Sequence, residues 1–242
     1  MSTHAEILQG LLRRPNLLES EVHTLPDTLP ALWNSDRFEQ EQLRGLVRQI
    51  FLPGWPRPAR QVVLSTIDEG IDVASTAVRI GKMMAAEIPG NVAIVEVSPV
   101  GSVAETSFGR NQPEQTDSDN RPAVLRGSSR QILSNLWLVP GYVFLAGHTE
   151  GLSASWLRGR LSELRLEFDY VLINAPPVNG SSEAALLGSL TDGVILTIAA
   201  NATRRAAARK SQFTLRQANA RLLGAILCER TFPIPERLYR KL

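Results

Sequence analysis

Residues Gln61 to Ala86 read QVVLSTIDEGIDVASTAVRIGKMMAA. An apolar run of strand type comes first, a short loop with a glycine follows, and apolar residues at helical spacing complete the stretch. Strand, glycine loop and helix is the arrangement of a phosphate-binding loop, in which backbone N–H groups and the positive end of the helix bind the anion. Such loops also carry a lysine for the outer phosphates and a Ser or Thr for magnesium. Here the loop carries Asp68, Glu69 and Asp72, and no lysine.

Two alignments of the loop are open, and neither supplies the lysine. In the first, Glu69 to Val73 stands where G-x-G-K-[ST] is expected. In the second, Ser75 and Thr76 take the Ser/Thr positions and Ala74 takes the lysine position. Lys82 lies roughly 10 Å further along the helix, too far to replace it.

The candidate cofactor-binding residues are therefore those of a vestigial nucleotide loop: Glu69, Gly70, Ser75 and Thr76. ATP or ADP with magnesium is a doubtful cofactor for such a loop, because three carboxylates face the place of the phosphates. The histidines are scattered along the chain and the single cysteine, Cys228, lies in an apolar run, so no metal site is expected.

Strand-like and helix-like segments alternate after residue 60, which predicts a doubly wound α/β fold with a mostly parallel sheet and helices on both faces. The expected strands are Gln61 to Thr66, Val92 to Val97, Trp137 to Leu145, Tyr170 to Ala175, Gly193 to Ala199 and Leu222 to Cys228. The expected helices are Asp72 to Glu87, Ser153 to Arg165, Ser182 to Leu190 and Thr203 to Ala218.

One main domain with a smaller extension is expected along the chain. Residues 1–60 form a helical N-terminal extension, in which Asn34 to Asp36 can cap a helix that runs to about Phe51, and residues 61–242 form the α/β domain. Residues 101–130 are polar and lack periodicity, which favours a long mobile loop.

The distribution of charge and of targeting signals limits the class of protein that the sequence can encode. No secretion signal and no apolar run of membrane-spanning length is evident, which favours a soluble cytoplasmic protein. After Thr203 the chain carries 10 of its 26 Lys and Arg residues but only 2 of its 24 acidic residues. This asymmetry can orient the protein on an anionic surface or an acidic partner, although a solvated helix face is the simpler interpretation. The basic helix lacks interleaved aromatic residues, so nucleic acid is not expected as a partner.

A family resemblance becomes specific near the middle of the chain. Phe168 to Val178 reads FDYVLINAPPV, Ser182 to Leu187 reads SEAALL, and Thr191 to Ile198 reads TDGVILTI. These stretches resemble the bacterial tyrosine kinases of capsular and exopolysaccharide synthesis, which have FDYVIIDTPPV, SDAxxL and DGVLLV there. The resemblance covers about residues 36–242 and is weakest at 100–130. It implies a P-loop ATPase-like fold related to the partitioning and positioning ATPases.

The sequence departs from the family at the other two nucleotide motifs as well. Glu96 stands in Val95 to Ser98, where the family has an aspartate-rich IDAD, and Asn174 replaces the aspartate that ends its strand. In the family these carboxylates hold magnesium and the water beside the transferred phosphate. Losing the lysine and this acid removes groups that act on transition-state charge. No catalytic residue is assigned, and the pattern favours a catalytically silent member.

Two further family features survive in part. The family's oligomerisation helix carries E-x-x-R-x-x-R; here Glu41 and Arg44 fit, and Arg48 is displaced by one position. An exposed helix with an i,i+3 ion pair explains the same residues equally well. The family's phosphorylated tail is a tyrosine cluster, whereas this chain has Tyr239 alone, as a candidate phosphosite or a half-buried anchor.

The resemblance implies a cytoplasmic subunit at the inner face of the cell membrane that regulates or scaffolds exopolysaccharide and capsule synthesis and export. Its expected partners are a membrane polysaccharide chain-length and export protein, further copies of itself, or an active kinase. An active ATP-dependent protein tyrosine kinase and a partitioning or positioning ATPase are the alternatives.

Overall fold

A computed structural model describes residues 35–52, 58–97, 125–146 and 153–228. These residues belong to one compact unit that extends from Ser35 to Pro235. The helix Ser35–Phe51 (α2) is part of that unit. The expected boundary near residue 60 stays a prediction, as does the mobile loop at 101–130, whose residues before 125 lie outside the described ranges.

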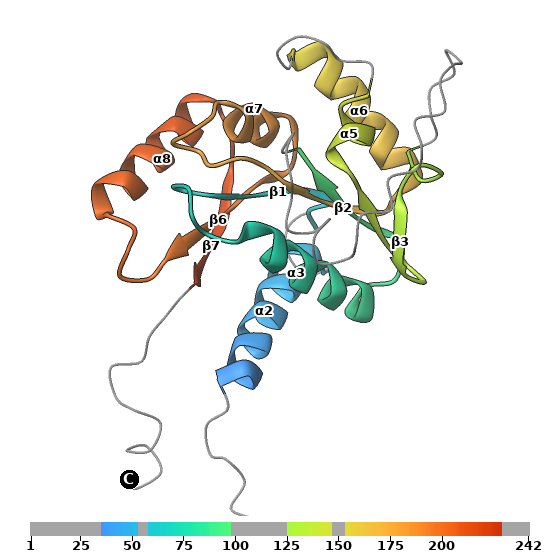
Figure 1. The fold of residues 1–242 in the computed structure, drawn as a ribbon, viewed down its shortest axis with the longest axis horizontal. Coiled ribbons are helices and arrows are strands. Elements are labelled where there is room, and N and C mark those ends of the chain that lie inside the picture. Colours follow the sequence, from blue (N-terminus) through green and yellow to red (C-terminus); the bar gives the residue numbers. More distant parts are fainter. Residues whose placement is uncertain (1–34, 53–57, 98–124, 147–152, 229–242) are drawn as a thin grey trace, which may run out of the picture. The chain divides into compact units, whose positions relative to one another are not determined.

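The centre of the unit is a seven-stranded sheet in the order β3-β4-β2-β5-β1-β6-β7 (Figure 1). All neighbouring pairs are parallel except β3 with β4. The predicted doubly wound α/β fold is confirmed. The strands are β1 (Gln61–Thr66), β2 (Val92–Glu96), β3 (Arg130–Leu133), β4 (Leu136–Val139), β5 (Tyr170–Asn174), β6 (Gly193–Ala199) and β7 (Leu222–Cys228).

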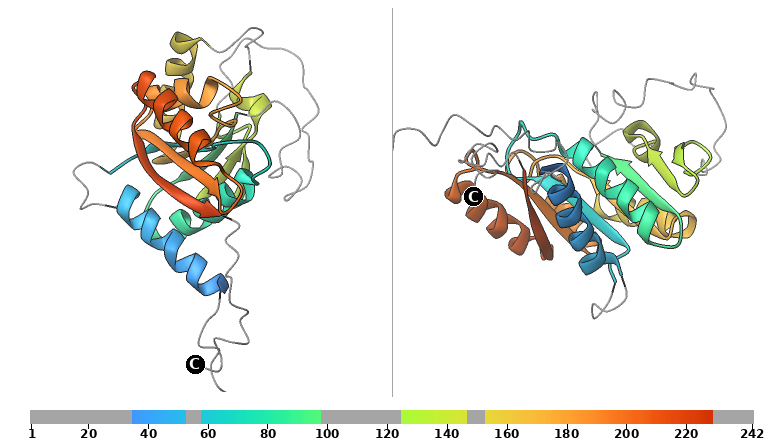
Figure 2. Two further views of the ribbon diagram at one scale, coloured as in Figure 1. Left: turned by 90° about the vertical axis from the view of Figure 1, so that its left-hand side faces the viewer. Right: turned by 90° about the horizontal axis from the view of Figure 1, so that it is seen from below.

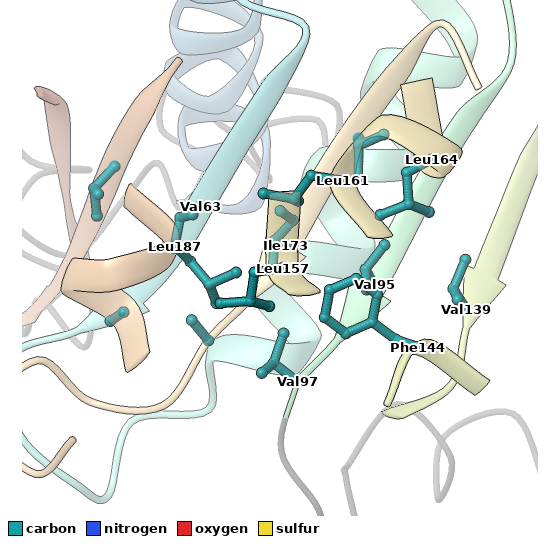
Figure 3. Packing of buried hydrophobic residues seen from close by; sticks show 14 of the residues in the cluster. Val63, Val95, Val97, Val139, Phe144, Leu157, Leu161, Leu164, Ile173 and Leu187 are labelled. Atoms are coloured by element: carbon teal, nitrogen blue, oxygen red, sulfur yellow. The ribbon is translucent and has the colours of Figure 1, made fainter. Parts of the chain in front are cut away.

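Helices cover both faces of the sheet. Strands β1, β2 and β4 are therefore buried along their whole length, and their side chains alternate between two apolar layers, one on each face. One layer lies under α2 and α3 (Val73–Glu87), and Figure 2 (right) shows these two helices crossing the same face. The other layer lies under α5 (Gly141–Phe144), α6 (Ala154–Glu167), α7 (Glu183–Leu190) and α8 (Arg205–Gln217). Figure 3 shows leucines of α6 and α7 and Phe144 of α5 packed on valines of the strands.

Two glycines allow close approaches in this arrangement. A Cβ at Gly81 of α3 would lie 2.6 Å from Ile94 Cδ1, so the glycine lets α3 sit tightly on β2. Gly193 begins β6 with φ +152°, and a Cβ there would lie 2.5 Å from the carbonyl oxygen of Arg221. That carbonyl accepts the N–H of Val194 at 2.7 Å, which starts the pairing of β6 with β7.

The structure corrects one predicted strand and adds one. The strand expected over Trp137 to Leu145 ends at Val139, because Pro140 lacks an N–H and its carbonyl instead accepts the N–H groups of Val143 and Phe144, which starts α5. Arg130–Leu133, which begins at the last residue of the expected mobile loop and was assigned to no strand, forms the antiparallel edge strand β3. Its side chains are mostly exposed, and its sequence RQIL does not alternate between apolar and polar residues.

Candidate functional site

The carboxyl ends of the three predicted motif strands meet at one edge of the sheet. Asn174 of β5 is the register partner of Leu64 of β1 on one side and of Glu96 of β2 on the other. The N–H of Val97 donates to the Asn174 carbonyl at 3.0 Å. In an open α/β sheet this edge is where ligands bind. The two predicted motif positions, Glu96 and Asn174, therefore lie side by side, next to the strand that leads into the loop.

Glu96 and Asn174 differ in their exposure. Glu96 is 1% exposed, whereas Asn174 is half-buried. Both follow residues of the apolar layer under α3, Ile94 and Leu172, by two positions, so both lie on the α3 face of the sheet. Ser98, the last residue of the second motif, lies outside the described residues.

The N-terminus of α3 is closed by a carboxylate of the chain itself. Asp72 is the N-cap residue, and its Oδ1 accepts the backbone N–H of Ser75 at 2.9 Å. The carboxylate therefore uses a helix N-terminal donor of the kind that binds phosphate in a phosphate-binding loop. The negative charge is also favourable at the positive end of the helix dipole.

The side-chain hydroxyls of Ser75 and Thr76, two of the candidate loop residues, both contact Asp72. Thr76 Oγ1 donates to the Asp72 carbonyl at 3.2 Å, and Ser75 Oγ does so at 3.5 Å. Their contacts therefore complete the first turn of α3. Ile71, next to the lysine position of the first alignment, is half-buried before the helix, and Ala74, the lysine position of the second, is 7% exposed and faces the core.

The rest of the loop is tied to the β5–α7 turn and to α8. Asn179 Nδ2 donates to Asp68 Oδ1 at 3.0 Å, and Ser211 Oγ of α8 donates to Asn179 Oδ1 at 3.1 Å. The N–H of Asn179 also donates to the carbonyl of Ile67 at 3.2 Å. We call the side chains of Asp68, Asn179 and Ser211 the loop network. Ser211 is fully buried, so this network anchors the loop to the buried side of α8.

The other two loop candidates are exposed. Gly70 has φ +100°, and a Cβ there would meet no atom within 4 Å, so glycine serves the turn and not a close contact. Glu69 is exposed, and its Oε1 lies 3.8 Å from the position of a Cβ on Gly180. The Glu69 side chain therefore extends toward the β5–α7 turn.

The described residues contain no cluster of three His, Cys, Asp or Glu side chains that could hold a metal ion. Within the same ranges, no helix combines the length and the apolarity needed to cross a membrane.

The residues predicted for oligomerisation bind within the chain. Arg44 donates to Glu41 on the same helix at 2.9 Å and to Glu87 at the end of α3 at 2.5 Å. Arg48 donates to the other carboxylate oxygen of Glu87 at 2.9 Å. We call these four residues the α2–α3 charge cluster. It joins α2 to α3, and the oligomeric role stays a prediction.

The contacts within the α2–α3 charge cluster shift the pKa values of Glu87 and Arg44. Burial tends to raise the pKa of Glu87, but the hydrogen bonds and charges of Arg48 and Arg44 outweigh it, so this pKa lies below the ordinary value. The hydrogen bond with Glu87, followed by the charge of Glu41, raises the pKa of Arg44. Tyr239, the candidate phosphosite, lies outside the described residues.

Sequence comparison relates the chain to bacterial tyrosine kinases. It is 32% identical over 78 residues to the tyrosine-protein kinase YwqD of Bacillus subtilis and 27% identical over 92 residues to the tyrosine-protein kinase CpsD of Streptococcus agalactiae. The matches cover 32% and 38% of this chain, and only 33% and 40% of those relatives. No protein-family profile matches the chain.

Solved structures support the same fold. The kinase domain of VpsO has a TM-score of 0.61 at 17% identity, over 81% of this chain and 98% of that domain. The chimerical protein CapA2B2 has a TM-score of 0.61 at 17% identity, over 79% and 85% of the two chains. The MinD cell division protein of Aquifex aeolicus has a TM-score of 0.51 at 14% identity, over 76% and 73%. The fold is that of P-loop NTPase-like domains, and the chain has homologues named as bacterial tyrosine-protein kinases.

Proposed function

From this kinship to tyrosine-protein kinases, we propose that the chain is a catalytically silent, kinase-like subunit that regulates or scaffolds exopolysaccharide and capsule synthesis and export. The observation that carries the proposal is the Asp72 carboxylate at the N-terminus of α3. A nucleotide phosphate bound there would have to replace this carboxylate or lie against it. The loop has no lysine to compensate for that charge.

Coulomb energies give the size of the barrier. Two unit charges about 4 Å apart repel by about 1 kcal/mol in water and more where water is displaced. Asp72 alone therefore weakens binding about fivefold for each phosphate charge at that distance, and Glu69 is a further exposed carboxylate of the same loop. Asn174 has no charge to help hold magnesium at the neighbouring strand end.

The first test is ligand binding to the unmodified chain. Its unfolding temperature is measured with ATP and with ADP, each with and without magnesium. A ligand at ~100 times its dissociation constant would add about 2.7 kcal/mol to the free energy of unfolding, so occupancy would be visible. We expect no shift at millimolar nucleotide. Hydrolysis of ATP at an ordinary enzymatic rate would refute the proposal.

The second test restores the missing groups. Ala74→Lys with Asn174→Asp, and separately Ile71→Lys with Asn174→Asp, supply a lysine at the second alignment's position or next to the first alignment's position, together with a magnesium ligand. The lysine at 74 starts from a buried position and must extend its stem along the helix to reach the loop. We expect nucleotide binding to return in one of the pairs; Asn174→Asp alone is the control.

An active ATP-dependent protein tyrosine kinase is the second candidate, favoured by the names of the relatives and by the Glu96 carboxylate beside Asn174. In that case Glu96 holds the metal or acts as the base. Transfer of phosphate to Tyr239 or to a partner, lost in Glu96→Gln, would support this function. A partitioning or positioning ATPase is the third candidate, and it requires dimerisation that depends on nucleotide.

The proposed partner is a membrane polysaccharide chain-length and export protein, contacted at the cytoplasmic side of the membrane. The α2–α3 charge cluster provides contacts for that protein, for a second copy or for an active kinase. Co-purification with such a membrane protein, weakened in Glu41→Gln with Arg48→Gln, is the expected result. Unchanged co-purification would remove the cluster from the proposal.

A further inference from the structure

Helix α8 carries an unusual set of exposed charges. Its sequence RAAARKSQFTLRQ contains no acidic residue. Six cations on the helix and its flanks are all exposed: Arg204, Arg205, Arg209, Lys210, Arg216 and Arg221. None of the six forms an ion pair with another described residue, whereas Arg44, Arg48 and Arg79 each form at least one.

An aromatic ring lies in the middle of these cations. Phe213 is 63% exposed, although the opposite side of the same helix buries Ser211 and Leu215. At about 100° per residue, Arg209 and Arg216 lie about 40° and 60° to one side of Phe213, and Lys210 lies about 60° to the other side. The outward face of α8 thus has an apolar centre with cations on both flanks. Figure 2 (left) shows α8 on the flank of the sheet nearest the viewer.

We propose that this outward face of α8 binds the surface of an anionic lipid bilayer directly, with Phe213 entering the headgroup region and the flanking cations contacting lipid phosphates. A helix with an apolar centre and cationic flanks lies in the plane of such an interface. Each Lys or Arg near an anionic leaflet contributes to the attraction, and unpaired cations lose no internal ion pair on binding.

The arrangement favours a bilayer over other anionic partners. The cations spread over a helix length of roughly 16 Å and do not converge on a pocket, as recognition of a single phosphate or acidic peptide would need. Single-stranded nucleic acid is bound on several stacking aromatic residues, and this face offers one. The inference is independent of the nucleotide site, because α8 binds lipid in this proposal with the loop empty or occupied.

The test measures sedimentation of the full chain with vesicles of phosphatidylcholine alone and of phosphatidylcholine with phosphatidylglycerol, without nucleotide. We expect binding only to the anionic vesicles, weakened by added salt. Arg209→Gln with Arg216→Gln should weaken binding about 30-fold, at about 1 kcal/mol for each charge. Phe213→Ser should weaken it several-fold, and Phe213→Trp should retain or strengthen it.

The matched control is Arg60→Gln with Arg158→Gln, which removes two exposed charges elsewhere on the same unit and should leave binding within about twofold, since those charges lie off the proposed face. Equal weakening by the control would mean that net charge alone drives binding, and would overturn the proposal. Full binding by the Arg209 and Arg216 variant would overturn it too, because cations elsewhere would then carry the affinity. Binding of an acidic peptide or single-stranded DNA through α8, with no vesicle binding, would assign the face to that class instead.

Discussion

The capping carboxylate of Asp72 can be separated into its two physical effects by two substitutions. Asp72→Asn keeps a side-chain oxygen for the Ser75 N–H and removes the charge, whereas Asp72→Ala removes both. Since Asp72 is exposed, loss of its charge at the helix N-terminus should cost only about 0.3 to 0.5 kcal/mol of unfolding free energy. Loss of the cap should cost about 1 kcal/mol more.

Urea denaturation of the three proteins measures these differences. The expected order of stability is the unmodified chain, then Asp72→Asn, then Asp72→Ala, with the larger step between the two variants. Equal stability of Asp72→Asn and Asp72→Ala would show that the side chain does not cap α3 in solution.

The same charge can be tested against nucleotide. In the Ala74→Lys with Asn174→Asp background, adding Asp72→Asn should tighten ATP binding about fivefold or more, from the repulsion of one phosphate charge. Isothermal titration with ATP and magnesium gives the two dissociation constants. If they are equal, repulsion by Asp72 is not what keeps phosphate from the loop, and the main support for a silent site is lost.

Two further predictions concern stability. Gly193→Ala should lower the free energy of unfolding by about 3 kcal/mol or more, because its Cβ would meet the Arg221 carbonyl and its φ is +152°. Thermal denaturation measures this change. In the control, Gly159→Ala, the new Cβ would meet no atom within 4 Å, so this variant should be slightly more stable than the unmodified chain. Since the folded-state pKa of Glu87 lies below its ordinary value of 4.5, its contribution to stability is present above that value and is lost as pH falls through the folded-state pKa. Glu87→Gln should therefore flatten the fall in stability between about pH 5 and pH 3, and an unchanged pH profile would contradict the lowered pKa.

The strands were predictable where apolar residues run without interruption. The structure gives the predicted bounds for β1, β6 and β7 and differs by one residue at the end of β2 and of β5. The prediction for Trp137 to Leu145 was too long because apolar residues lie on both sides of Pro140, at Trp137 to Val139 and at Val143 to Leu145, and composition alone does not reveal a single helical turn. The edge strand β3 was not predicted because it alternates in neither burial nor polarity.

The candidate site was predictable in position but not in its contacts. The rule that ligands bind beyond the carboxyl ends of parallel strands predicted that the motif strands would meet, and Glu96 and Asn174 are register partners. The loop network was not predicted, because Asp68, Asn179 and Ser211 are joined across 111 and 32 residues of sequence. Asp72 was recognised as an acid that opposes phosphate, while its capping bond depends on the side-chain direction and on where α3 begins.

The loop network and the Asp72 cap together have a consequence for how the cell would control such a protein. Phosphate-binding loops that report on nucleotide do so because the ligand supplies contacts that the empty loop lacks. In this chain Asp68 and Asp72 already bind Asn179 and Ser75, so these loop contacts are complete without a nucleotide. If the proposed silent role holds, the loop gives the subunit no switch that depends on nucleotide. Its influence would then scale with the number of copies present, and control would pass to synthesis and degradation of the chain.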